Sequence, residues 1–167
     1  MDTHDFNDGK GPVPAHQHTN PTGSIGGWVA KTAFVAGTAY IGPDAKVCGN
    51  ARVFDNAKVF DNAKVYGNAL VYGNALVFDN AWVFGNAQVF DNALVYDNAQ
   101  VCGEALVYDN AWVYGNAWVC GNAQVFDNVL VYDNAKVFGN AEVSGNALVF
   151  GTANVYDYAT VYKGAHK

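Results

Sequence analysis

The chain has 167 residues, a formal net charge of -6 and only 14% charged residues. This length suits one domain of ordinary size, and the acidic balance argues against nucleic-acid binding, which normally leaves a basic footprint on a protein. No run of about 18 apolar residues occurs, so no membrane span is expected.

Residues 1–25 lack the repeat that follows and are rich in Gly, Pro, His and Asp. They contain no apolar segment of the kind that a secretory signal requires, so we expect a cytoplasmic protein. The segment is expected to be a flexible arm or a cap over the first coil, because solenoids hide their open edge. The pair His16-x-His18 would need a third ligand, such as His4 or Asp5, to hold a metal, and we predict no metal site.

Residues 26–167 consist of a six-residue repeat. Every sixth residue from Val29 to Val161 is Val, except Ile41, and Ala recurs with the same period from Ala33 to Ala165, except at Val129. The unit A-x-V-[FY] predicts an extended strand with Ala and Val on one face and x and the aromatic residue on the other. The next two residues, Asp-Asn or Gly-Asn, favour a corner because they tolerate left-handed backbone conformations. We therefore predict four-residue strands separated by corners.

Two architectures fit such a repeat. A meander of antiparallel hairpins would leave the Val and Ala face of a flat sheet uncovered. A solenoid buries that face inside a closed coil, so we predict a solenoid.

The corner residues indicate how many sides each coil has. If a residue stacks on the residue 18 positions later, one column of corners is glycine in six consecutive coils (Gly49, Gly67, Gly85, Gly103, Gly121 and Gly139). The other two columns are mainly Asp (Asp55, Gly73, Asp91, Asp109, Asp127 and Gly145; Asp61, Asp79, Asp97, Gly115, Asp133 and Gly151). This sorting predicts an all-β, three-sided parallel coil of 18 residues with between seven and eight coils. At a strand spacing of ~4.8 Å the rod would be roughly 35 Å long.

A three-sided coil with this unit resembles the hexapeptide-repeat proteins, and the segments "VFGNAQ", "VYDNAQ" and "IGPDAK" are typical of them. The resemblance covers residues 26–165 and implies a left-handed parallel β-helix, although left-handed crossovers are rare elsewhere. It also implies relatives among trimeric acyltransferases and γ-class carbonic anhydrases, which use histidines from the coils or from an inserted loop. This chain has no histidine from Ile25 to Ala165 and no interrupted unit. The stretch "GGWVAKTAFVAGTAYIGPDAKVCGNARV" is more similar to uncharacterised repeat-only proteins of bacteria and phages, so incorporation into a phage particle is a further option.

The outward side chains point to a self-association surface. Five consecutive coils present a large apolar residue (Leu76, Leu94, Trp112, Leu130 and Leu148) beside a column of aromatic residues (Phe60, Phe78, Tyr96, Tyr114, Tyr132 and Phe150). An exposed apolar patch of this kind marks an interaction site, although stacking within the chain is an alternative role for the aromatic column. We expect a homo-oligomer, with a trimer favoured because proteins of the resembled family trimerise.

The preferred function is therefore a non-catalytic structural or binding module without a cofactor. One alternative is an acyltransferase-like enzyme that takes His4, His16 or His18 from a neighbouring subunit as its general base. Another is a binder of small ligands in grooves between protomers, which a pocket lined by Trp82, Trp118 or residues 1–25 would favour.

The remaining columns have mainly structural interpretations. Asp suits tight turns, whereas a stacked ladder such as Asp91, Asp109 and Asp127, or Asp61, Asp79 and Asp97, could instead hold Ca²⁺ or mimic nucleic acid. At an oligomer's rim we expect these carboxylates to splay into solvent or to meet Lys46, Lys58 or Lys64. The column from Asn50 to Asn146, broken at Glu104, predicts a hydrogen-bonded ladder. Cys48, Cys102 and Cys120 share one column, and we expect free thiols because in-register parallel geometry is poor for a bridge.

Overall fold

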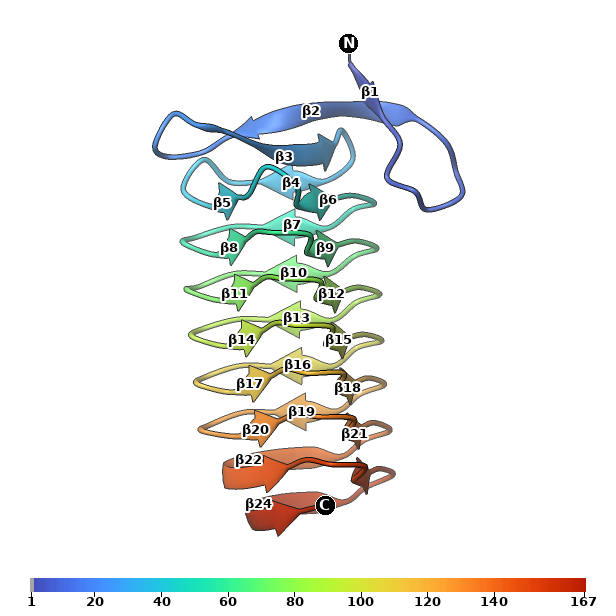
Figure 1. Ribbon diagram of the computed structural model, residues 1–167, viewed down its shortest axis with the longest axis vertical. Helices are drawn as coiled ribbons and strands as arrows, with labels where there is room; N and C mark the ends of the chain where they lie inside the picture. Colours follow the sequence, from blue (N-terminus) through green and yellow to red (C-terminus); the bar gives the residue numbers. More distant parts are fainter. Residues whose placement is uncertain (1) are drawn as a thin grey trace.

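The computed structural model describes residues 2–167, which form a three-sided parallel β-solenoid capped at its N-terminal end (Figure 1). Each coil contributes one short strand to each of three faces. Face A contains eight strands, so the chain makes about eight turns. None of the described residues form a helix that could cross a membrane.

The strands of face A are β3 (Ile25–Ala30), β6 (Lys46–Val47), β9 (Lys64–Val65), β12 (Trp82–Val83), β15 (Gln100–Val101), β18 (Trp118–Val119), β21 (Lys136–Val137) and β23 (Asn154–Val155). Face B contains β4 (Phe34–Val35), β7 (Arg52–Val53), β10 (Leu70–Val71), β13 (Gln88–Val89), β16 (Leu106–Val107) and β19 (Gln124–Val125). Face C contains β5 (Tyr40–Ile41), β8 (Lys58–Val59), β11 (Leu76–Val77), β14 (Leu94–Val95), β17 (Trp112–Val113) and β20 (Leu130–Val131). The longer strands β22 (Glu142–Val149) and β24 (Thr160–His166) continue faces B and C around one corner.

Stacking of each residue on the residue 18 positions later is confirmed. Ile41 pairs with Val59 near the start of the coil, Leu76 pairs with Leu94 in the middle, and Val143 pairs with Val161 near the end. Going down the rod in Figure 1, the chain passes from β7 at the back to β8 at the front left and then to β9 at the front right, so the coil is left-handed.

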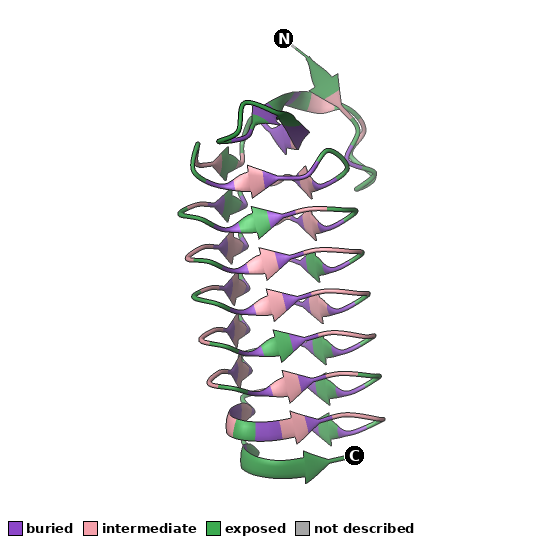
Figure 2. Cartoon of the chain, turned by 60° about the vertical axis from the view of Figure 1, so that its left-hand side comes forward, coloured by how far each residue is buried: buried purple, intermediate pink, exposed green. Residues whose placement is uncertain are grey.

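The core is a column of small side chains. Every Val and Ala of the inner columns from Ala39 to Val149 is buried, including Val129, the one valine in an alanine column. In Figure 2 each strand of face C accordingly has one buried half and one half turned outward. Burial of each Val removes apolar surface from water, a gain of about 1.5–3 kcal/mol at most per side chain.

The strands are two residues long, so the prediction of four-residue strands was wrong in length. The hydrogen bonds of one repeat give the reason. Leu76 N–H donates to the Ala93 carbonyl and Phe78 N–H to the Val95 carbonyl of the next coil (both 3.0 Å), but Ala81 N–H donates back to the Phe78 carbonyl (3.2 Å). The aromatic residue and the following alanine therefore close a turn rather than extend the strand.

At each corner the residue after the aromatic adopts a left-handed conformation, with φ of 56° at Asp97 and 73° at Gly67. The turn interpretation of the Asp columns is thus supported by the backbone. A Cβ atom at Gly67 would lie 2.9 Å from the Gly85 carbonyl oxygen, but Gly73 in an Asp column is equally close to its neighbour. Nothing in these contacts explains why one corner column is glycine in six consecutive coils before it ends in Asp157.

Residues 2–24 form a cap. The strand β1 (Thr3–His4) pairs antiparallel with β2 (Val13–Thr19), and β2 pairs antiparallel with β3, so the edge of the first coil on face A is covered (Figure 1). The cap also completes the edge of face C through a side chain. Asn20 is buried, accepts a hydrogen bond from Ile41 N–H (2.8 Å) and donates one to the Ile41 carbonyl (3.0 Å), as a neighbouring strand would.

The last coil departs from the repeat. After Val143 pairs with Val161, the register between β22 and β24 shifts by one residue, and Leu148 pairs with Ala165. Ala165 was expected on the inner face with the other alanines. It is exposed, because the shift places Gly164 rather than Ala165 beside Ala147.

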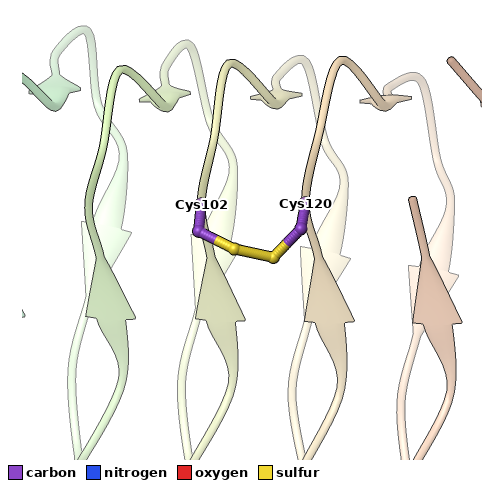
Figure 3. Close-up of a disulfide and its surroundings, with 2 residues drawn as sticks. All are labelled: Cys102 and Cys120. Carbon is purple, nitrogen blue, oxygen red and sulfur yellow. A yellow bond between two sulfur atoms is a disulfide. The ribbon is translucent and has the colours of Figure 1, made fainter. Parts of the chain in front are cut away.

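The expectation of three free thiols was wrong. Cys102 and Cys120 form a disulfide across two consecutive coils (Figure 3), and Cys48 is the free cysteine of residues 2–167. The Cα atoms of the pair are 4.6 Å apart, which is within the range that disulfides span, so in-register parallel stacking does permit a bridge here.

Candidate functional site

Face C carries the predicted self-association surface, which we call the apolar stripe: Leu76, Leu94, Trp112, Leu130 and Leu148. Strand pairing places these five residues in one column along consecutive coils. The four leucines are half-buried by their neighbours, whereas 42% of the Trp112 surface is exposed. The stripe is therefore continuous, with one prominent side chain at its centre.

Beside the stripe runs an uninterrupted ladder of six rings, from Phe60 to Phe150. Neighbouring rings are stacked with centroids 4.9–5.3 Å apart and nearly parallel planes. Burial, followed by the neighbouring Tyr114, raises the pKa of the Tyr96 hydroxyl. Neighbouring rings of the same chain thus cover much of the ring surface in this ladder, which agrees with a stabilising role for the ladder.

The other two faces are less uniform. Their outward residues alternate between apolar, amide and charged types (face A: Lys46, Lys64, Trp82, Gln100, Trp118 and Lys136; face B: Arg52, Leu70, Gln88, Leu106, Gln124 and Glu142). The ring ladder of face A is also interrupted, since the disulfide lies between the stacked pairs Tyr66–Phe84 and Phe138–Tyr156. Of the three faces in the described chain, face C alone is apolar in both outward columns over five consecutive coils.

The Asn ladder is confirmed. Asn68 donates to Asn86 and Asn122 donates to Asn140, both at 3.0 Å, and similar bonds link Asn residues at the other two corners. The ladder that contains Asn68, Asn86, Asn122 and Asn140 is interrupted at Glu104, which replaces an Asn in that column. Its role is to connect coils.

Five of the corner carboxylates accept a hydrogen bond from the backbone of the next coil. Asp97 accepts a hydrogen bond from Gly115 N–H (3.1 Å) and Asp127 accepts one from Gly145 N–H (2.8 Å), in each case one coil further on. Asp55, Asp79 and Asp133 do the same. Within residues 2–167 no group of three His, Cys, Asp or Glu side chains is arranged to hold a metal ion. In the single chain these Asp residues therefore support the coil and do not pair with Lys46, Lys58 or Lys64.

The histidines of the cap lie apart from one another. His18 is buried and its Nε2 lies 3.1 Å from the Ala39 carbonyl, whereas His16 is exposed, because the pairing of β2 with β3 is irregular between Gln17 and Thr19. Burial lowers the pKa of His18. His4 stacks on Trp28 (4.7 Å between ring centroids), and burial, followed by the charge of Lys46, lowers its pKa. The carboxylate of Asp5 accepts a hydrogen bond from Asn7 N–H. The proposed ligand set of His16, His18 and His4 or Asp5 is thus not assembled.

The cap forms one concave site, which we call the cap groove. It consists of two adjoining cavities of about 290 Å³ each, between the loop after β1 and the first coils of face A. One cavity is lined by Phe6, Asn7, Asp8, Lys46, Cys48, Lys64, Tyr66 and Trp82. The other shares Phe6, Asp8 and Cys48 and adds Lys10, Val13, Pro14, Ala30, Lys31, Thr32 and Gly49. A ligand pocket was predicted to involve Trp82, Trp118 or the N-terminal segment. The structure brings Trp82 and the cap together within one chain, whereas Trp118 does not line the groove.

The groove also contains residues that sequence analysis did not associate with a site, namely Phe6, Asp8 and Cys48. The repeat could reveal that Lys46 and Lys64 stack, since they are 18 residues apart, but it contains no information on what the non-repeat loop covers. Burial, followed by the charge of Asp8, raises the pKa of the Cys48 thiol to about 11, although Lys10, Lys64 and Lys46 lower it. Cys48 is therefore a protonated thiol at neutral pH and a poor nucleophile.

Comparison with known proteins supports the fold. Three segments, residues 63–77, 87–103 and 105–121, match the YdcK beta solenoid repeat. These segments lie in the coils from β9 to β18 and are therefore similar to the repeats of that β-solenoid family. No curated protein matches the chain.

Proposed function

We propose that this protein, whose middle coils carry YdcK-type solenoid repeats, is a non-catalytic structural module that self-associates through face C. The observation that carries the proposal is the continuity of the apolar stripe and its ring ladder over five coils. On faces A and B, built from the same repeat, lysine, arginine, glutamine or glutamate interrupts the apolar residues at the equivalent outward positions.

The partner that fits face C best is a second copy of the chain. The apolar stripe of the second copy has the same spacing per coil as that of the first. Apolar side chains of the two copies would therefore meet at every coil. Trp112, the most exposed residue of the stripe, lies at its centre, where interfaces place their energetically dominant residues. The resemblance to hexapeptide-repeat proteins favours a trimer.

The orientation of the corner carboxylates supports close approach. Two Asp columns flank face C, and unpartnered carboxylates at the rim would repel those of a neighbouring copy. Those of Asp97 and Asp127 are instead hydrogen-bonded to backbone N–H groups of the next coil. Five of the eight flanking carboxylates are held along the rod in this way (Asp55, Asp79, Asp97, Asp127 and Asp133), whereas Asp61, Asp91 and Asp109 are not.

The histidines of the cap support a non-catalytic role. His18 is buried against the Ala39 carbonyl, and His4 is stacked on Trp28. Either side chain would have to leave these contacts to serve as a general base in another subunit. His16 is exposed, but no charged partner orients it within residues 2–167. We retain membership of the wider hexapeptide-repeat group and a cytoplasmic location as proposals based on the sequence.

A second candidate function is ligand binding, which the cap groove favours because Trp82 and the cap loop line it together. This groove lies within one chain, so it differs from the inter-protomer grooves expected from the sequence.

Light scattering coupled to size exclusion tests self-association. We expect the unmodified protein to be an oligomer and the double variant Leu94→Asp, Leu130→Asp to be a folded monomer, because both side chains point outward. The matched control is Leu70→Asp, Leu106→Asp on face B, whose side chains are also outward and half-buried and which we expect to leave the oligomer intact. A monomeric unmodified protein, or dissociation by the face B control alone, would contradict the proposal.

A further inference from the structure

We propose that the cap groove binds a small organic anion that carries a flat ring. This site is separate from face C and does not depend on self-association. The groove combines basic charge, aromatic walls and one side formed by the cap.

The charge of the groove is opposite to that of the protein. The chain has nine Lys and Arg residues against fifteen Asp and Glu. Four of the nine basic residues line the groove (Lys10, Lys31, Lys46 and Lys64), whereas Asp8 is the one acidic residue in its walls. Asp8 pairs with Lys10 at 3.6 Å, and this is the one ion pair of residues 2–167. The groove is therefore a basic site on an acidic protein.

The strongest evidence for an anion site is the pair Lys46 and Lys64. They are paired on adjacent strands of face A, so both side chains leave the sheet on the same side, one strand spacing apart. No carboxylate of the described chain lies within ion-pair distance of either ammonium group. Like charges in such a cross-strand pair destabilise a sheet, and a bound anion between them would remove that repulsion.

The walls of the groove supply a surface for a planar group. The Trp82 ring lies edge-on to Tyr66 with centroids 6.2 Å apart, and Lys64 Nζ lies 5.0 Å from the centre of the Trp82 ring. Phe6, which is almost completely buried, closes the side of the groove formed by the cap. An acid attached to a ring could therefore place its charge between the two lysines and its ring against Trp82, once Lys64 moves from over the Trp82 ring toward the acid.

A second Lys–Trp pair on the same face provides a comparison. Lys136 Nζ lies 5.4 Å from the centre of the Trp118 ring, again on adjacent strands. This pair lies several coils from the cap and lines neither cavity of the groove. The Lys64–Trp82 pair differs by facing the cap loop across the groove, and 37% of the Trp82 surface stays exposed. Each cavity, at about 290 Å³, lies near the lower limit for ligand pockets, so a molecule with one ring suits it.

The experiment uses the ¹H–¹⁵N signals of the four tryptophan indoles in the full-length protein, assigned by single substitutions. Phenyl phosphate and benzoate are titrated separately. Benzamide, which lacks the charge, and inorganic phosphate, which lacks the ring, are the control probes. We expect a saturable shift of the Trp82 indole signal with at least one ring-bearing anion and no shift of the Trp118 signal. The stronger of the two anions identifies the acid group, and benzamide and inorganic phosphate should bind at least about tenfold more weakly.

Variants then locate the site. Lys64→Gln should weaken binding at least about tenfold, because it removes a charge-assisted contact, whereas Lys136→Gln should leave it unchanged. Circular dichroism confirms that both variants are folded, and Lys46→Gln provides a second test should Lys64→Gln unfold. The proposal is overturned if neither anion gives a saturable Trp82 shift, if benzamide binds as well as the anions, or if Lys136→Gln weakens binding as much as Lys64→Gln.

Discussion

Cys102 is joined to Cys120 by a disulfide (Figure 3), in a column where neighbouring coils place stacked aromatic rings. Both cysteines occupy the position that Tyr66 and Phe84 occupy in the preceding coils, just before the glycine corner. The bridge is thus a covalent replacement for ring stacking between two coils. It also divides the ring ladder of face A into two parts.

The disulfide predicts one reactive thiol per chain. After denaturation without reductant, mass spectrometry should detect one alkylated cysteine, and after reduction it should detect three. Replacing Cys102 and Cys120 with Ser should lower the free energy of unfolding by up to about 3 kcal/mol, because the bridge closes a loop of 18 residues in the unfolded chain. Three alkylated cysteines without reductant would contradict the bridge.

Ring stacking should contribute more at the centre of the face C ladder than at its end. Tyr114 stacks on Tyr96 and Tyr132 (4.9 and 5.1 Å), whereas Phe150 stacks on Tyr132 (5.3 Å). We expect Tyr114→Leu to destabilise the fold by ~0.5–1.5 kcal/mol more than Phe150→Leu, since one additional ring contact is lost. Chemical denaturation measures the difference, and equal losses would show that stacking contributes little.

The Asp corners combine a left-handed backbone with a carboxylate that accepts a hydrogen bond. Substitutions at Asp97 distinguish the contributions of these two features to stability. Asp97→Asn should be nearly neutral, because Asn tolerates φ near 56° and retains an acceptor oxygen. Asp97→Ala should cost ~2–3 kcal/mol, the sum of left-handed strain and the lost bond from Gly115 N–H. Asp44→Ala serves as a control, because Asp44 is an exposed corner residue without a positive φ. A loss at Asp44 as large as that at Asp97 would exclude this explanation.

Burial of Cys48 should appear in its reactivity. With a pKa raised to about 11, the thiol is protonated at pH 8, and its alkylation by iodoacetamide should accelerate as the pH rises toward 11. In the urea-unfolded protein the same cysteine should show an inflection near the ordinary value of about 8.5. Identical pH profiles for the folded and unfolded chains would show that the cap does not shield this thiol.

Much of the coil can be predicted from the sequence because the repeat is itself a description of the contacts. When each residue stacks on the one 18 positions later, the columns that contain Gly85, Asn86 or Tyr96 can be written down before any coordinates are known. The inward Val and Ala, the corner chemistry and the ladders all follow from translation along one axis. The strand length was overestimated because the Ala81 amide bonds within its own turn, a local choice that the alternation of side chains does not reveal.

The cap groove and the disulfide were decided by the tertiary structure. Residues 2–24 do not repeat, so no period indicates that β2 would run antiparallel to β3, that His18 and Asn20 would turn inward, or that Phe6 would line a cavity with Lys46 and Lys64. Cys102 and Cys120 were correctly placed as vertical neighbours, but whether they bond depends on a Cα separation of 4.6 Å and on side-chain directions. The sequence by itself determined which residues stack, because every coil makes the same contacts with the next coil at a fixed offset of 18 residues. Only the folded chain decided which side chains meet where that repetition ends or where a bond depends on side-chain geometry.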